Sequence, residues 1–161
     1  MHKAAASSPT RRLFTALVPD AGACTAIDAA RRQWGGLPAR VRPAAERMHL
    51  TLQFFDAVDA AHEAAWQAAL ATLRFAPFDV ELDRAELWHA PRDTIAALRA
   101  APSPPLAALH AATDALARTA GLAPDRRPWK PHLTVLRQAG QVVRARLGEP
   151  VRWRVHALHL V

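Results

Sequence analysis

The strongest constraint on this chain is a short segment that occurs twice. Residues 48–52 read Met-His-Leu-Thr-Leu, and residues 131–136 read Pro-His-Leu-Thr-Val-Leu. Side chains alternate between the two faces of a β-strand, so the histidine and the threonine of each copy share one face and the aliphatic residues share the other. The pairs on one face are His49 with Thr51, and His132 with Thr134. We predict that the two strands face each other and form one site.

Paired imidazole and hydroxyl groups are suited to displacement at a phosphodiester. Histidine titrates near neutral pH, so one ring can take a proton from water while the other gives a proton to the leaving oxygen. The threonine hydroxyls can donate to the non-bridging phosphate oxygens. We therefore predict catalytic roles for His49 and His132 and phosphate binding by Thr51 and Thr134. This chemistry requires no metal and no cofactor.

Charge and composition narrow the range of partners and locations. The chain of 161 residues carries 21 Lys and Arg against 14 Asp and Glu, a net charge of +7. This excess favours an anionic partner, although arginine-rich composition from GC-rich coding explains it equally well. The single cysteine, Cys24, excludes an intramolecular disulfide and is expected to be a small apolar helix residue. Without a long apolar segment we expect no membrane association, a cytoplasmic location and a monomer.

Proline, glycine and the hydrophobic pattern divide the chain into alternating elements. Residues 1–10 are predicted to be a flexible lead-in and residues 11–161 one domain. Asp20 is a predicted N-cap, and Gly121 is predicted to end a helix. We predict strands at 13–18, 46–55, 78–82 (extended past a bulge or turn by 85–88), 94–98, 131–136 and 151–161, and helices at 20–34, 59–73, 106–120 and 141–147.

This order of elements predicts an α+β fold with mainly antiparallel sheet, because helices and strands do not alternate strictly. An internal duplication of low similarity is also visible. Each half contains a helix, a basic loop with proline (40–43 or 126–130) and a His-Leu-Thr strand. The matching order suggests two related lobes.

The two motifs and their surroundings resemble the 2H phosphoesterase superfamily, and within it the LigT-like RNA 2′,3′-cyclic phosphodiesterases, also called 2′-5′ RNA ligases. The resemblance covers about residues 11–161 and rests on 12–19, 50–55 and 129–137. Asp56 stands where relatives usually have glycine. The resemblance implies two pseudo-symmetric lobes, each a mainly antiparallel sheet with helices outside, and an active-site cleft between them. It also implies opening of the cyclic phosphate to a 2′-phosphate, and reversible 2′-5′ ligation.

Other residues are candidates for substrate contacts. The resemblance places Arg137 at the phosphate, although it lies one residue off the His132/Thr134 alternation. Candidate RNA contacts are aromatic or basic residues near the motifs, for which packing or ordinary solvation is the alternative: Phe14, Arg42, Arg47, Arg127, Trp129 and Lys130. The other tryptophans, including Trp88, are expected to be packing residues. His156 and His159 would point to opposite sides of a strand, which argues against a zinc site.

Three functions agree with these observations. The first is metal-independent hydrolysis of 2′,3′-cyclic phosphate ends of RNA or nucleotides, with His49 interpreted as the general acid and His132 as the general base. The second keeps the chemistry but acts on a small non-RNA cyclic phosphate, such as ADP-ribose cyclic phosphate. The third is a non-catalytic basic module that binds RNA.

Overall fold

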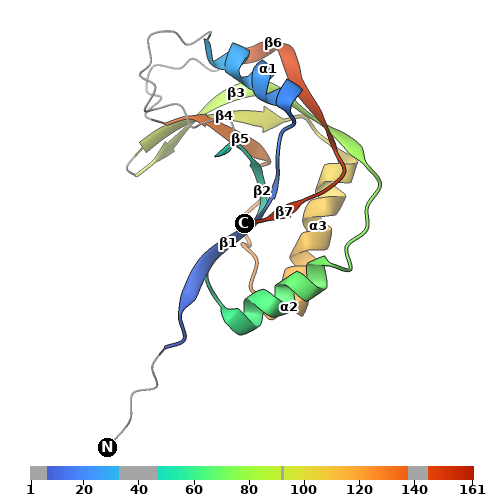
Figure 1. Cartoon of the computed structure of the whole chain (residues 1–161). Helices are drawn as coiled ribbons and strands as arrows, with labels where there is room; N and C mark the ends of the chain where they lie inside the picture. Colours follow the sequence, from blue (N-terminus) through green and yellow to red (C-terminus); the bar gives the residue numbers. More distant parts are fainter. Residues whose placement is uncertain (1–6, 33–46, 92, 138–144) are drawn as a thin grey trace, which may run out of the picture.

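The computed structural model describes residues 7–32, 47–91, 93–137 and 145–161, which fold into one curled sheet flanked by helices (Figure 1). The elements, in chain order, are β1 (Thr10–Leu17), α1 (Ala21–Arg32), β2 (Leu50–Asp59), α2 (Ala60–Leu70), β3 (Phe78–Ala90), β4 (Asp93–Ala100), α3 (Pro104–Thr119), β5 (His132–Leu136), β6 (Ala145–Val155) and β7 (His159–Leu160). The α+β class predicted from the sequence is confirmed. Most of the predicted lead-in, residues 1–6, lies outside the described ranges.

The seven strands lie in the order β6-β3-β4-β5-β2-β1-β7, and each neighbouring pair is antiparallel. Two halves meet in the middle, where β2 and β5 pair at Leu50 and Leu133. The two predicted lobes are therefore halves of one continuous sheet.

The halves repeat the same local order, as the internal duplication predicted. One unit runs β1-α1-β2 and the other β4-α3-β5, and within each unit the first strand pairs with the second. Helices α1 and α3 each pack against strands of the other half. Helix α1 packs against β5 and β6, whereas α2 and α3 pack against β2 (Figure 1).

The main core lies on one face of this sheet. The aliphatic residues between and after the motif histidines and threonines are fully or almost fully buried: Leu50, Leu52, Leu133 and Val135. They belong to the same cluster as Ile27 of α1 and Leu106 of α3. Burial of such side chains contributes about 1.5–3 kcal/mol each. The helices thus cover the aliphatic face, and the histidine face stays open.

Local capping signals explain where the helices begin and end. Oδ1 of Asp20 accepts from the Ala23 amide at 2.8 Å, and Asp59 caps α2 by accepting from the His62 amide at 2.8 Å. Gly121 follows α3 with φ of 82°, a conformation that glycine adopts without steric cost. These three predictions of helix boundaries are confirmed, although residues 33 and 34 lie outside the described ranges.

Two predictions near the C-terminus are wrong. Residues 145–147 belong to β6 and not to a helix, because Ala145 and Arg146 pair with β3; residues 141–144 lie outside the described part of the chain. The strand predicted at 151–161 is two strands. β6 ends at Val155, and β7 then pairs with β1 at Thr15 and Leu160. Four residue steps span at most about 14 Å, so the two outer edges of the sheet approach each other here.

None of the helices in the described part of the chain combines the length and apolar character that a membrane span requires.

Replacement of Gly121 by alanine should destabilise the fold. An added Cβ would strain the positive φ and would lie 3.3 Å from the His62 ring. We expect a loss of about 1–2 kcal/mol in the free energy of unfolding, measured in urea. The matched control is Gly22→Ala within α1, where the new Cβ meets Asp20 at an ordinary 3.5 Å. This control should stabilise the protein by about 0.5–1 kcal/mol, and equal effects of the two variants would contradict the argument.

Candidate functional site

The pairing of β2 with β5 brings the two motifs together. Leu50 pairs with Leu133 in antiparallel register. The same register places His49 opposite Thr134 and Thr51 opposite His132. The two histidines become diagonal neighbours, which typically lie about 7–8 Å apart. The two imidazole rings and the two threonine hydroxyls therefore share one face of the sheet.

Both imidazole rings are held in the same way. Nδ1 of His49 lies 2.8 Å from the carbonyl oxygen of Arg47, and Nδ1 of His132 lies 2.7 Å from that of Lys130. A carbonyl oxygen only accepts hydrogen bonds, so each Nδ1 carries the proton and donates. In the neutral ring Nε2 is then left as the proton acceptor. Each histidine can therefore take or give a proton through Nε2.

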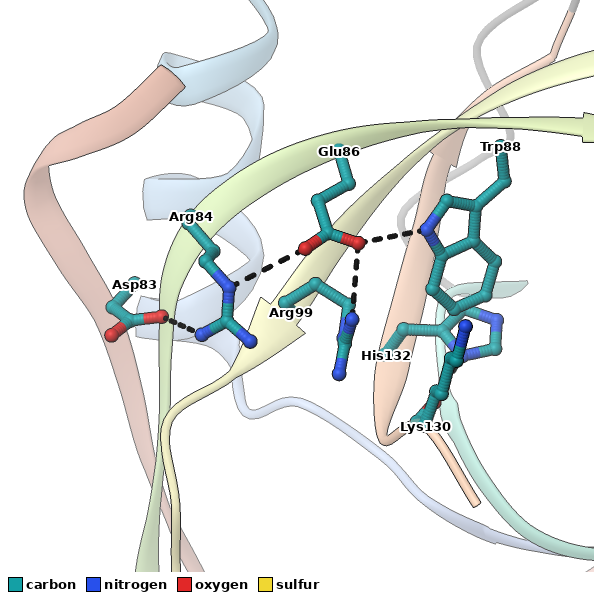
Figure 2. Close-up of polar contacts among 7 residues, drawn as sticks. All are labelled: Asp83, Arg84, Glu86, Trp88, Arg99, Lys130 and His132. Carbon is teal, nitrogen blue, oxygen red and sulfur yellow. Dashed lines mark hydrogen bonds and ion pairs between the residues drawn. The ribbon is translucent and has the colours of Figure 1, made fainter. Parts of the chain in front are cut away.

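The two rings differ in their aromatic neighbours. Phe14 stacks on His49 with ring centroids 4.7 Å apart. Trp88 of β3 lies against His132 with centroids 4.2 Å apart and a tilt of 57° (Figure 2). Trp88 also donates from its indole nitrogen to Glu86 at 2.9 Å, which fixes the indole. Within the ranges that the structure describes, the aromatic neighbour of the second histidine belongs to a polar network and that of the first does not.

A pocket of about 630 Å³ opens beside the second motif. It is lined by residues from β2, β3, α3, the segment before β5 and the start of β5, among them Thr51, Phe54, Trp88, Arg127, Lys130 and His132. One wall is Trp129, whose indole nitrogen donates to the Thr51 carbonyl at 3.2 Å and whose ring stacks on His110 at 4.0 Å. This volume is large enough for a small organic ligand.

A register shift in β2 decides which side chains face the pocket. Thr15 pairs with Gln53 but the next residue of β1 pairs with Thr51, so one residue of β2 is extra. Gln53, which still lines part of the pocket, is therefore only 4% exposed, and its amide donates to the His110 carbonyl of α3 at 3.3 Å. Phe54 remains 49% exposed at the pocket. Strict alternation along β2 would have predicted Gln53 to be exposed and Phe54 to be buried.

Burial lowers the pKa of His132 below its usual value. The carbonyl of Lys130 opposes this shift, and the positive charges of Arg99 and His49 add to it. Burial and the neighbouring positive charges therefore favour the neutral form of the His132 ring.

The predicted contact residues lie in different surroundings. Arg127 is exposed and pairs with Asp125 at 2.6 Å, and both residues line the pocket. Arg47 and Lys130 are exposed, and each supplies the carbonyl that holds a histidine. Arg137 lies just past β5, 64% exposed and 3.8 Å from Asp93, and it is not among the residues lining the pocket. Arg42 lies outside the described residues.

Three residues at the site had no predicted role, namely Glu86, Arg99 and His110, and a fourth, Trp88, was expected to be a packing residue. Glu86 and Trp88 share a strand face at spacing two, which was a usable signal. Their proximity to His132 depends on β4 lying between β3 and β5, which no local pattern indicates. His156 and His159 lie apart from the site, outside β6 and in β7 respectively. Among the described residues no group of three or more His, Cys, Asp or Glu is placed to hold a metal ion.

Comparison with known proteins then gives the family. Residues 19–161 match the model of the 2′-5′ RNA ligase superfamily. The chain belongs to this superfamily.

Solved structures agree with this membership. LigT of E. coli, in complex with 3′-AMP, superposes with a TM-score of 0.78 at 29% identity, covering 94% of this chain and 87% of that one. A structure described as a phosphoesterase gives 0.77 at 30% identity with the same coverage. Protein TT0787 of Thermus thermophilus, at 21% identity and TM-score 0.73 over 92% of this chain and 86% of that one, shares the fold. No curated protein matches. The chain is a LigT-like 2H phosphoesterase, and this fold supports phosphodiesterase-type activity.

Titration should reveal the burial of His132. We expect the C2 proton of its ring, followed by NMR, to titrate with a midpoint below the usual value of about 6.5, because burial disfavours the charged ring. The His132→Gln variant assigns the signal by its disappearance. A midpoint at or above about 6.5 would contradict the environment described for this ring.

Proposed function

We propose that this protein hydrolyses 2′,3′-cyclic phosphate ends of RNA or nucleotides to 2′-phosphates without a metal. The observation that carries the proposal is the crossed register of the two motifs, which sets each histidine opposite the threonine of the other motif. In-line displacement requires two proton-transfer groups on either side of one phosphate, and the diagonal placement of the two histidines supports this arrangement.

The proposed reaction begins with the cyclic phosphate between the two rings. Thr51 and Thr134 donate to its non-bridging oxygens and stabilise the charge that develops there. One histidine removes a proton from water, which attacks phosphorus. The other protonates the departing 3′ oxygen, and the product keeps its phosphate on the 2′ oxygen. The reverse reaction, with a 5′-hydroxyl in place of water, would form a 2′-5′ linkage.

We assign His132 as the general base and His49 as the general acid. A base must be neutral before it acts, and the lowered pKa of His132 favours its neutral form. Its Nδ1 donates to the Lys130 carbonyl at 2.7 Å, so the accepting lone pair on Nε2 is available.

The pocket supports a nucleotide as part of the substrate. Its aromatic lining, with Phe54 and Trp129, can contact a base, and its basic residues Arg127 and Lys130 can contact phosphates. Structures of the relative LigT contain 3′-AMP, NADP+ and ATP. Phe14, stacked on His49, and Arg47 are placed to extend such contacts, and Arg137 remains a proposed phosphate ligand.

Replacement of either histidine tests the mechanism. His49→Ala and His132→Ala should each lower kcat for 2′,3′-cyclic AMP by about 10²–10⁴-fold, because each removes one proton-transfer group. The assay contains EDTA, and the product isomer is identified by chromatography. His156→Ala, an exposed histidine away from the site, is the control and should keep full activity.

Two outcomes would contradict the proposal. Full activity in either site variant would reject the two-histidine mechanism, and a 3′-phosphate product would reject the assigned leaving group. Binding of RNA by the wild type with no hydrolysis would favour the non-catalytic alternative.

Substrate length separates an RNA end from a small cyclic phosphate. If RNA is the substrate, an oligonucleotide with a 2′,3′-cyclic end should show a higher kcat/KM than 2′,3′-cyclic AMP, and its KM should rise with salt as phosphate contacts are screened. A preference for the mononucleotide by orders of magnitude would instead support a small-molecule substrate.

A further inference from the structure

The strand pairing beside the two motifs is symmetric, but the residue next to each histidine on the neighbouring strand differs. In the first half Leu17 of β1 pairs with Leu50, and in the second Leu98 of β4 pairs with Leu133. One step further along β4, Arg99 pairs with His132. The corresponding step beyond Leu17 leads to Val18, opposite His49. A partly buried cation therefore neighbours one histidine, and an aliphatic residue that is 42% exposed lies at the corresponding position near the other.

Several contacts hold Arg99 at this position (Figure 2). Its Nη1 donates to Oε2 of Glu86 at 3.0 Å, and the same oxygen accepts from the Trp88 indole at 2.9 Å. The guanidinium carbon lies 5.6 Å from the centroid of the Trp88 ring. Only 16% of the Arg99 side chain is exposed, so solvent screens its charge incompletely. Glu86 thus fixes both groups that border His132 on this side.

The other charged groups around His132 are few in the described part of the chain. Arg84 reaches Glu86 at 3.5 Å and also pairs with Asp83 at 3.0 Å, one strand further away (Figure 2). Lys130 lies two residues before His132 and lines the same pocket. His49, just before β2, also acts electrostatically on His132. Of the two arginines bound to Glu86, Arg99 is the one in register with His132.

We propose that Arg99, held by Glu86 and Trp88, is the positioning residue that makes the two symmetric histidines chemically unequal. Its fixed charge beside His132 disfavours the imidazolium there, whereas the corresponding position near His49, among the described residues, is the uncharged Val18. This inference rests on the proposed phosphodiesterase function and on the assignment of His132 as base. It adds that the direction of proton transfer is set from β3 and β4, outside the two motifs.

The pH dependence of kcat/KM tests this role. The acidic limb of the profile reports the base and the alkaline limb the acid. Arg99→Gln removes the charge that disfavours protonation of His132, so the acidic limb should move to higher pH. A shift of about half a unit would lower kcat/KM roughly threefold at pH values below the limb. The same shift should appear in the NMR titration of His132.

Three further variants separate charge from packing. Arg99→Lys keeps the charge and should restore the acidic limb towards its wild-type position, which a purely structural role of the guanidinium would not do. Arg84→Gln removes a charge from the same Glu86 network and is the matched control, with the acidic limb unchanged. Trp88→Phe keeps the ring against His132 but frees Glu86, and should shift the limb less than Arg99→Gln does.

The mirror-image variant provides the reciprocal test. Val18→Arg places a cation opposite His49 and should move the alkaline limb to lower pH, and the exposure of Val18 makes this change tolerable for folding. An unchanged acidic limb in Arg99→Gln, with the wild type active and both histidine variants inactive, would overturn the role of Arg99 alone. An inactive wild type, or active histidine variants, would instead reject the proposed function.

Discussion

The pairing of β2 with β5 is the interaction on which the site depends. It joins the two halves of the sheet at Leu50 and Leu133, both of which are fully buried. The aliphatic side chains between the histidines and threonines fix this register, because a slip by one residue would turn them into the cleft and the histidines into the core. Core packing and site geometry therefore have one cause.

The duplication gives the chain two equal histidines, and the chemistry needs them to differ. The same backbone contact to the carbonyl two residues earlier holds both rings, so their local structure is equivalent. The difference between the two rings has to come from residues outside the two motifs. Trp88 and Arg99 border only His132, and Glu86 orders both. An acid and a base can be distinguished in this way without any change to the motifs themselves.

Different parts of this protein were predictable to different degrees. Helix caps at Asp20 and Asp59 and the end of α3 at Gly121 depend on neighbouring residues, and the sequence indicated them correctly. The segment at 145–147 was predicted as helix but forms strand, because its pairing with β3 is a long-range interaction. Phe54 faces the pocket only because a register shift in β2 reverses the alternation after Thr51.

The sequence by itself determined that each histidine shares a strand face with its threonine, since alternation is a property of the backbone. It also determined the α+β class and the duplicated order of elements. The tertiary structure decided which threonine stands opposite which histidine, and that Trp88 and Arg99 lie beside only one ring. Those neighbours come from β3 and β4, and strand order and register are set by burial across the whole sheet and not by local sequence.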